Sequence, residues 1–149
     1  MNKNDLVGRI QDHLSKPQKS ERWAMYCLIA PVVDFANSTM GLEAYFEFNQ
    51  TSAHGTSQSV DIALLDGLVP RVMVEAKRVD RRIAAEQISK YLKPNLRGLV
   101  TNGVHWVMCL DGESKAISLC DIRDGTVAAD SLDEVIAFIR GEEPNKSGW

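Results

Sequence analysis

No apolar run in this 149-residue chain approaches the length of a membrane span. The N-terminal segment MNKNDLVGRIQDH is polar and amphipathic, unlike the apolar centre of a secretory signal peptide. The three cysteines, Cys27, Cys109 and Cys120, form no CxxC or Cys/His pair, so neither a zinc site nor a disulfide framework is indicated. We therefore expect a cytoplasmic protein with buried thiols and no membrane partner.

The chain also lacks the motifs of several common enzyme classes. No GxSxG, P-loop or GxGxxG motif occurs, so hydrolase-elbow and nucleotide-binding interpretations have no support. The apolar fraction of 44% and the charged fraction of 25% are ordinary for a globular protein. At this length we expect one domain over residues 1–149, with its core at about 21–122 and a polar tail at 141–149.

Positive charge is outnumbered by negative charge, and the net charge of −3 argues against a protein that coats nucleic acid nonspecifically. The basic residues are unevenly placed, because eight of them and only three acidic residues lie between Arg71 and Arg97. That segment carries a net charge of +5, which leaves −8 for the rest of the chain. A basic stripe of this kind fits either a contact surface for a phosphate backbone or an ordinary solvated helix face.

Hydrophobic spacing predicts helices at 3–14, about 21–36, 81–92 and 131–140. Ser20 and Ser131 are expected as N-caps, and Pro31 predicts a kink or an early end of the second helix. Strands are expected at 44–48, 60–65, 72–77, 98–101 with 105–110, and 115–121, with a polar loop at 49–59. The order α-α-β-β-β-α-β-β-α predicts a mixed sheet flanked by helices, in an α/β or α+β domain.

The segment from 60 to 91 contains residue types that suit phosphodiester hydrolysis. In a strand over 72–77 the side chains alternate between faces, so Glu75 and Lys77 share one face and Asp61 can join them from the neighbouring strand. Two carboxylates can hold a hard cation such as Mg²⁺. A lysine can orient water or stabilise negative charge as it develops. The backbone carbonyl of Ala76 is a further candidate ligand.

Three other polar side chains have two interpretations each. Gln87 and Tyr91 lie four residues apart on one face of the predicted helix. They either hydrogen-bond to the site or to a phosphate, or they are amphipathic boundary residues. His54, in the loop before Asp61, either touches substrate or is simply solvated.

This series of residues resembles the PD-(D/E)xK nuclease superfamily. The resemblance is carried by Asp61, by Glu75-Ala76-Lys77, and by the QISKY run from Gln87 to Tyr91, which follows the QxxxY pattern of RecB-type nucleases. The next segment, RGLVTNGVHWVMCL, is similar to the N-terminal nuclease domain of type I restriction enzyme R subunits. The similarity spans roughly 21 to 110, and Val60 stands where the name-giving motif has proline.

The resemblance implies a restriction-endonuclease-like fold with an αβββαβ core, and Mg²⁺- or Mn²⁺-dependent cleavage of DNA. By position, Asp61 and Glu75 would ligate the cation, Lys77 would position the water and Gln87 would assist. Glu21 either completes the metal site or serves only at the start of its helix. The residues expected to contact nucleic acid are Arg78, Arg81, Arg82, Lys90, Tyr91 and Lys93.

The shortness of the chain shapes the expected partners. No helicase motor follows the domain, so we expect an endonuclease that works alone or with separate motor or specificity subunits. Cutting both strands of a duplex would be easiest for a homodimer. The alternative is a non-cleaving nucleic-acid-binding or regulatory module with the same fold, and a third option is a protein-interaction domain.

Overall fold

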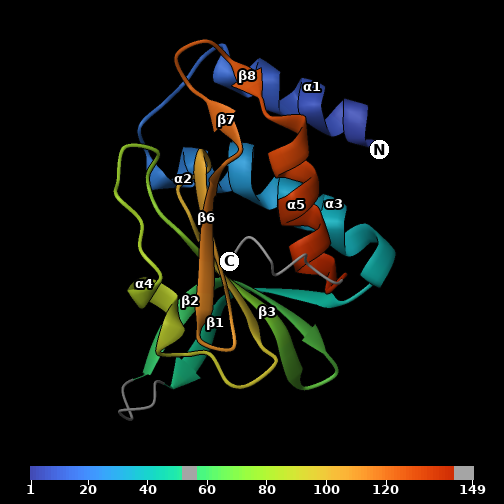
Figure 1. Ribbon diagram of the computed structural model, residues 1–149, viewed down its shortest axis with the longest axis vertical. Coiled ribbons are helices and arrows are strands. Elements are labelled where there is room, and N and C mark those ends of the chain that lie inside the picture. The colour runs from blue at the N-terminus through green and yellow to red at the C-terminus, as the bar shows by residue number, and fades with distance from the viewer. Residues whose placement is uncertain (52–56, 143–149) are drawn as a thin grey trace.

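A six-stranded mixed sheet, in the order β1-β2-β3-β4-β5-β6, forms the centre of the computed structural model, which describes residues 1–51 and 57–142 (Figure 1). Its strands are β1 (Glu43–Thr51), β2 (Ser57–Asp66), β3 (Val69–Ala76), β4 (Arg97–Thr101), β5 (His105–Leu110) and β6 (Glu113–Ser118). Only β3 and β4 are parallel; the other neighbours are antiparallel. A separate small hairpin joins β7 (Cys120–Asp121) to β8 (Thr126–Val127).

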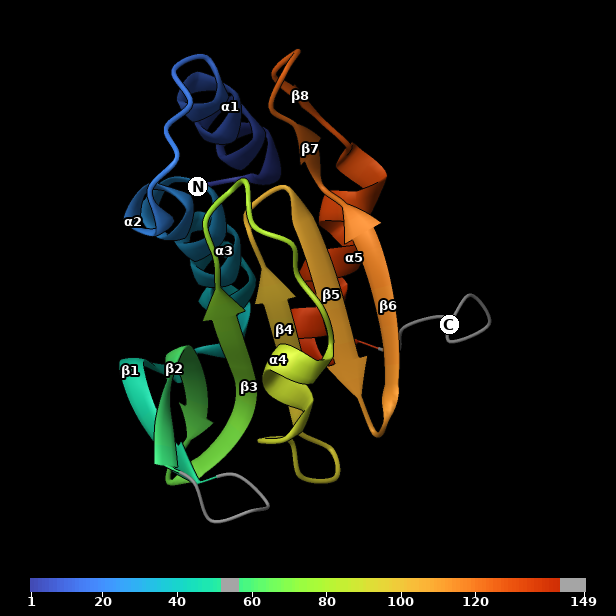
Figure 2. The ribbon, with the colours of Figure 1, turned by 90° about the vertical axis from the view of Figure 1, so that its left-hand side faces the viewer.

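Helices lie on both faces of this sheet. They are α1 (Lys3–Leu14), α2 (Glu21–Trp23), the π-helix η1 (Ala24–Ile29), α3 (Ala30–Met40), α4 (Glu86–Ser89) and α5 (Ala129–Arg140). Figure 2 shows α3 and α5 behind the sheet and α4 in front of it. The described helices include none with the length and apolar character that crossing a bilayer requires.

The two faces bury separate apolar cores, as the strand alternation predicts. Val72 and Val74 of β3 pack into the larger core with α1, η1, α3 and α5. Met73, between them, packs into the smaller core with Ile88 and Tyr91 of the α4 segment. The predicted fold class is confirmed: a mixed sheet is flanked by helices, and α3, β1, β2, β3, α4 and β4 follow one another in αβββαβ order.

The second predicted helix is longer than expected. Ser20 caps it as predicted, since its hydroxyl oxygen accepts a hydrogen bond of 3.0 Å from the Trp23 N–H. The early end at Pro31 is wrong, because the helical path continues to Met40. Proline cannot donate to the helical ladder. The chain accommodates it by passing through the π-helix η1, which widens the helix just before Pro31.

The predicted helix over 81–92 is wrong in length, since only Glu86–Ser89 is helical. A tertiary bond explains part of this, because the Arg81 carbonyl accepts from the Asn102 side chain at 2.9 Å and not from a helical N–H. The predicted cap at Ser131 is also wrong, since α5 begins at Ala129. The strand expected over 115–121 is divided between β6 and β7.

The expected bounds of the loop at 49–59 are wrong, because β1 reaches Thr51 and β2 begins at Ser57. His54 lies outside the described residues, as does the part of the polar tail at 143–149.

Gly103, between β4 and β5, has a positive φ that residues other than glycine rarely adopt. Its φ is +91°, and a Cβ there would lie 2.7 Å from Leu28 Cδ1. Gly112 has a similar φ of +83° but no heavy atom within 4 Å of such a Cβ. We expect Gly103→Ala to lower the free energy of unfolding by about 1–3 kcal/mol more than Gly112→Ala, the range for overpacking a core. Urea denaturation of both variants measures this, and equal losses would contradict the packing explanation.

Candidate active site

Asp61 lies where strands β2 and β3 separate. Their antiparallel pairing runs as far as Ile62 opposite Val74, so Asp61 and Glu75 are the next residues on the two strands. The Asp61 carboxylate accepts a hydrogen bond of 2.7 Å from the Ala76 N–H. This carboxylate therefore takes the place of a backbone acceptor at the point of separation, and the bond fixes it beside Glu75.

The neighbouring strand β1 is irregular at the same level. Phe46 pairs with Ile62 and Phe48 pairs with Val60, which places Glu47 opposite Asp61. Glu47 has a φ of +55°, a left-handed conformation that is uncommon for a residue other than glycine. Val60 packs into the smaller core and Ile62 into the larger one, so ordinary alternation is interrupted across Asp61. Local strain of this kind is concentrated at functional sites in proteins.

Glu75 is half-buried, and its pKa is shifted by burial and by the charged groups around it. Burial, followed by the hydrogen bond and the charge of Asp61, raises the pKa of Glu75 from 4.5 to about 8. Lys77 opposes this shift in pKa, and Glu21 adds to it. The structure thus brings Asp61, Lys77 and Glu21 near Glu75, with the carboxyl groups of Asp61 and Glu75 in hydrogen-bond contact. Without a cation, such a pair is most stable when it holds one proton.

Lys77 follows directly after β3. Its backbone N–H donates to the Thr101 carbonyl at 2.8 Å, which continues the contact with β4 by one residue. Its side chain is half-buried and close enough to Glu75 to lower the pKa of that carboxyl group. The backbone of Lys77 is therefore ordered next to Glu75, and its ammonium group is near enough to act on that carboxyl group by its charge.

A pocket of about 360 Å³ is lined by Asp61, one member of this pair. One wall comes from the start of the second helix, with Glu21 in the first turn of α2. The full lining consists of Glu21, Arg22, Met25, Tyr26, Phe46, Glu47, Asp61 and Ala76. Glu21 is thus at the same pocket as Asp61 while also lying in the first turn, where a carboxylate suits the helix dipole.

The candidate ligands fit Mg²⁺ or Mn²⁺ as a site of two carboxylates, which water and substrate oxygens would complete. In residues 1–51 and 57–142, no three His, Cys, Asp or Glu side chains are grouped closely enough to hold a metal ion by themselves. Mg²⁺ commonly uses one or two carboxylates and completes its octahedron with waters and substrate oxygens. Asp61 and Glu75 could supply two such carboxylates, and Ala76 lines the same pocket as Asp61.

Gln87 and Tyr91 do not join this group. The Gln87 side-chain oxygen accepts from the Ala84 N–H at 2.9 Å, within its own turn. Tyr91 is only 3% exposed and packs in the smaller core, which corrects its expected place on a nucleic-acid-binding surface. Lys90 lies over the Tyr91 ring, 5.2 Å from its centroid. The spacing of these residues predicted a shared face but not which face is buried.

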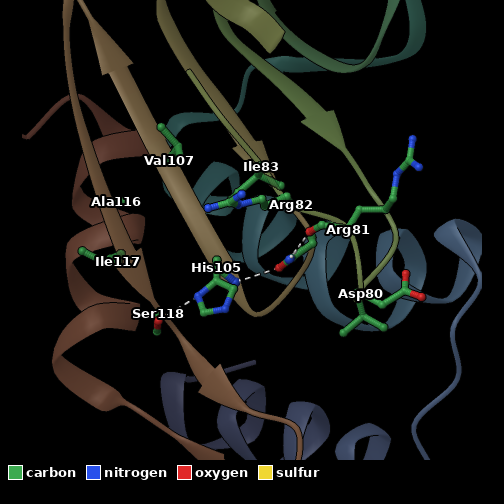
Figure 3. A pocket seen from close by; sticks show the side chains of 11 residues that line it. Asp80, Arg81, Arg82, Ile83, His105, Val107, Ala116, Ile117 and Ser118 are labelled. Carbon is green, nitrogen blue, oxygen red and sulfur yellow. Dashed lines mark hydrogen bonds between the residues drawn. The ribbon is translucent and has the colours of Figure 1, made fainter. Parts of the chain in front are cut away.

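The predicted basic side chains are on the surface. Those that are exposed are Arg78, Arg81, Arg82, Lys90 and Lys93. Arg78 forms an ion pair of 3.3 Å with Asp80. Arg81 and Arg82 line a separate pocket of about 510 Å³, where His105 Nδ1 and the Ser118 hydroxyl oxygen are 2.8 Å apart (Figure 3). The basic residues that follow Lys77 in the sequence therefore lie on an exposed surface.

Sequence reasoning missed five lining residues of the candidate active site: Arg22, Met25, Tyr26, Phe46 and Glu47. The two aromatic residues belong to segments whose apolar pattern suggests core positions. Both are instead exposed, by 58% for Tyr26 and 56% for Phe46. Only the tertiary structure places them at one pocket, because the two side chains come from separate elements.

Comparison with known proteins supports the fold. No family model and no curated protein matches the chain. Among solved structures, a chain in the cryo-EM structure of the DrdV–DNA complex matches with a TM-score of 0.70 and 19% identity. The match covers 94% of this chain and 14% of that chain, so this chain spans a small part of the larger protein. The likeness shows a shared fold, and the sheet is consistent with a restriction-endonuclease-like fold.

Proposed function

We propose that this chain is a nuclease that uses a divalent cation to hydrolyse DNA phosphodiester bonds. The observation that carries the proposal is the contact between Asp61, which lines an open pocket, and Glu75, whose pKa Lys77 lowers. Bringing two carboxyl groups together out of water is unfavourable, and a hard cation is the ligand that relieves it. Perturbed carboxyl groups in a pocket are typical of functional sites.

The chain's residues have distinct roles in this proposal. Asp61 and Glu75 would hold Mg²⁺ or Mn²⁺, with the Ala76 carbonyl and Glu21 as further oxygen donors. A cation bound there supplies positive charge to the scissile phosphate. Lys77 would orient the attacking water and stabilise negative charge on the phosphate oxygens. Gln87 has no role in this proposal, because its side chain bonds within its own turn, to the Ala84 N–H.

DNA is proposed as the substrate on two grounds. The neighbour of similar fold is part of a DNA complex. The exposed basic residues that follow Lys77 supply charge for a phosphate backbone. We further propose an endonuclease that acts as a homodimer or with separate motor or specificity subunits, since one small site cuts one strand at a time.

The test is incubation of the protein with linear, circular, single-stranded and branched DNA in Mg²⁺, in Mn²⁺ and in EDTA. We expect products in either metal and none in EDTA, and cleavage of the circular DNA would establish an endonuclease. Binding to DNA with no product on any substrate in either metal would reject the nuclease. That result would favour a non-cleaving module with a nuclease fold.

The basic surface predicts a measurable salt dependence. We expect the double variant Arg81→Gln/Arg82→Gln to weaken DNA binding at all sequences. It should also lower the slope of log K against log[salt] by about 0.7–0.9 for each phosphate that the variant no longer neutralises. Fluorescence anisotropy over a salt series measures the slope. The control is Lys3→Gln, which removes a lysine paired with Asp133 at 2.9 Å. An unchanged slope in the arginine variant would remove this surface from the proposal.

A further inference from the structure

We propose that the pocket at Asp61 binds an unpaired nucleobase between Tyr26 and Phe46, so that single-stranded or locally unpaired DNA is the preferred substrate. This inference rests on the proposed function, because it places the base beside Asp61, which with Glu75 would hold the cation that acts on the scissile phosphate. It names a substrate class and two specificity-determining residues.

The first argument is the unusual exposure of two aromatic rings at one pocket. Tyr26 is 58% exposed and Phe46 is 56% exposed, although large aromatic side chains are usually buried. They come from different walls, Tyr26 from the π-helix η1 and Phe46 from the strand β1. π-Helical turns are frequent at functional sites. Two exposed aromatic side chains lining one 360 Å³ pocket are suited to a flat aromatic ligand.

The second argument is the charge of the pocket. Glu21, Glu47 and Asp61 line it together with only one cation, Arg22. Without a cation such a lining disfavours a phosphate inside the pocket, but a carboxylate that is not a cation ligand in this proposal, such as Glu47, can accept hydrogen bonds from the exocyclic amino groups of bases. The uncharged base would therefore occupy the pocket. Its phosphate would remain at the mouth, next to the cation site and to Arg22.

The third argument is geometric. In a duplex each base is stacked and paired, so its face is not available to an aromatic side chain. In a single strand or a frayed end the base can leave the stack, and every base has a π face for Tyr26 and Phe46. The pocket would thus act before cleavage, because it selects substrates whose bases are already free.

The experiment measures binding without cleavage. The wild-type chain, Tyr26→Ala and Phe46→Ala are titrated in EDTA against two fluorescein-labelled probes. One probe is a mixed-sequence single strand. It is longer than roughly 16 nucleotides, the upper site size of one OB fold bound to a single strand. The other is a blunt duplex of the same sequence. Matched controls are Tyr45→Ala, an exposed aromatic of the same strand that bonds to Glu43, and Tyr26→Phe, which keeps the ring.

We expect each alanine variant in the pocket to weaken single-strand binding about tenfold, within the 5- to 150-fold range that corresponds to one base–aromatic stack of roughly 1–3 kcal/mol. Duplex binding should change by less than about twofold, as should single-strand binding by Tyr45→Ala and Tyr26→Phe. Unchanged single-strand affinity would overturn the proposal. Equal losses on both probes would also overturn it, since they indicate an aromatic wedge in a duplex.

A second measurement covers the case in which an alanine variant does not fold. The wild-type chain is mixed with a single strand that carries 2-aminopurine, and stacking on an aromatic ring is expected to quench its fluorescence. No change on saturation would reject the base pocket.

The outcomes separate this inference from the nuclease. Metal-dependent cleavage that is unchanged in Tyr26→Ala and Phe46→Ala, together with unchanged single-strand binding, would support the nuclease activity and reject the base-binding pocket. The expected binding pattern without any cleavage would support the base-binding pocket and reject the nuclease activity.

Discussion

Lys77→Ala is expected to slow DNA cleavage by about 100- to 1,000-fold, the usual cost of removing one group that stabilises charge in the transition state. The lysine is placed at Glu75 by its bond to the Thr101 carbonyl, and its side chain is half-buried. That backbone bond does not involve the side chain. The variant should therefore keep the fold and lose the chemistry.

Single-turnover cleavage at saturating DNA measures this effect separately from binding. Lys3→Ala is the matched control, because it removes a lysine on α1 that is paired with Asp133. The thermal midpoint of Lys77→Ala should lie near that of the wild type. If the variant cleaved DNA as fast as the wild type in Mg²⁺ and Mn²⁺, the active-site assignment would fail.

The metal-free protein is expected to lose stability as the pH rises from about 5 to 9. Burial and Asp61 raise the pKa of Glu75 to about 8 in the folded state, above the 4.5 of a free glutamate. Between these two values the folded chain holds a proton that the unfolded chain releases. The free energy of unfolding contributed by that proton is present below pH 4.5 and is lost as the pH passes 8.

Glu75→Gln should remove this pH dependence, because the amide does not titrate. Divalent cations should act in the opposite direction in the wild type. A cation at 100 times its Kd stabilises a folded protein by about 2.7 kcal/mol, and the effect should grow with pH as the proton at Glu75 is displaced. Thermal melts across the pH range, with Mg²⁺ and with EDTA, measure both effects. A flat curve for the wild type, or equal stabilisation of Glu75→Gln by Mg²⁺, would contradict the paired-carboxylate site.

Local pattern was sufficient for much of the fold and for the centre of the site. Alternation along 72–77 predicted which side chains of β3 face each core, and β5 has the expected bounds at His105–Leu110. The grouping of Asp61, Glu75 and Lys77 followed from strand adjacency, because residues opposite each other on neighbouring strands are close. Such inferences hold where one element and its immediate neighbour determine the result.

The errors arise where distant parts of the chain determine the structure. Asn102 takes the Arg81 carbonyl, so a helix expected from spacing shortens to one turn. Tyr91 has helical spacing from Gln87, but the packing of α4 on the sheet buries it. Phe46 follows the alternation of a core strand, yet it borders an open pocket beside Glu47. None of these contacts has a signature within a short window of sequence.

The central claim is that a divalent cation binds between Asp61 and Glu75. Crystals soaked in MnCl₂ test it most directly, by the position of the anomalous scattering peak of Mn²⁺. The proposal predicts one strong peak within about 2.2 Å of a carboxylate oxygen from each residue, close to the distances of octahedral Mg²⁺ sites. The peak should be absent from Glu75→Gln crystals. A peak elsewhere, or none between these carboxylates, would contradict the account.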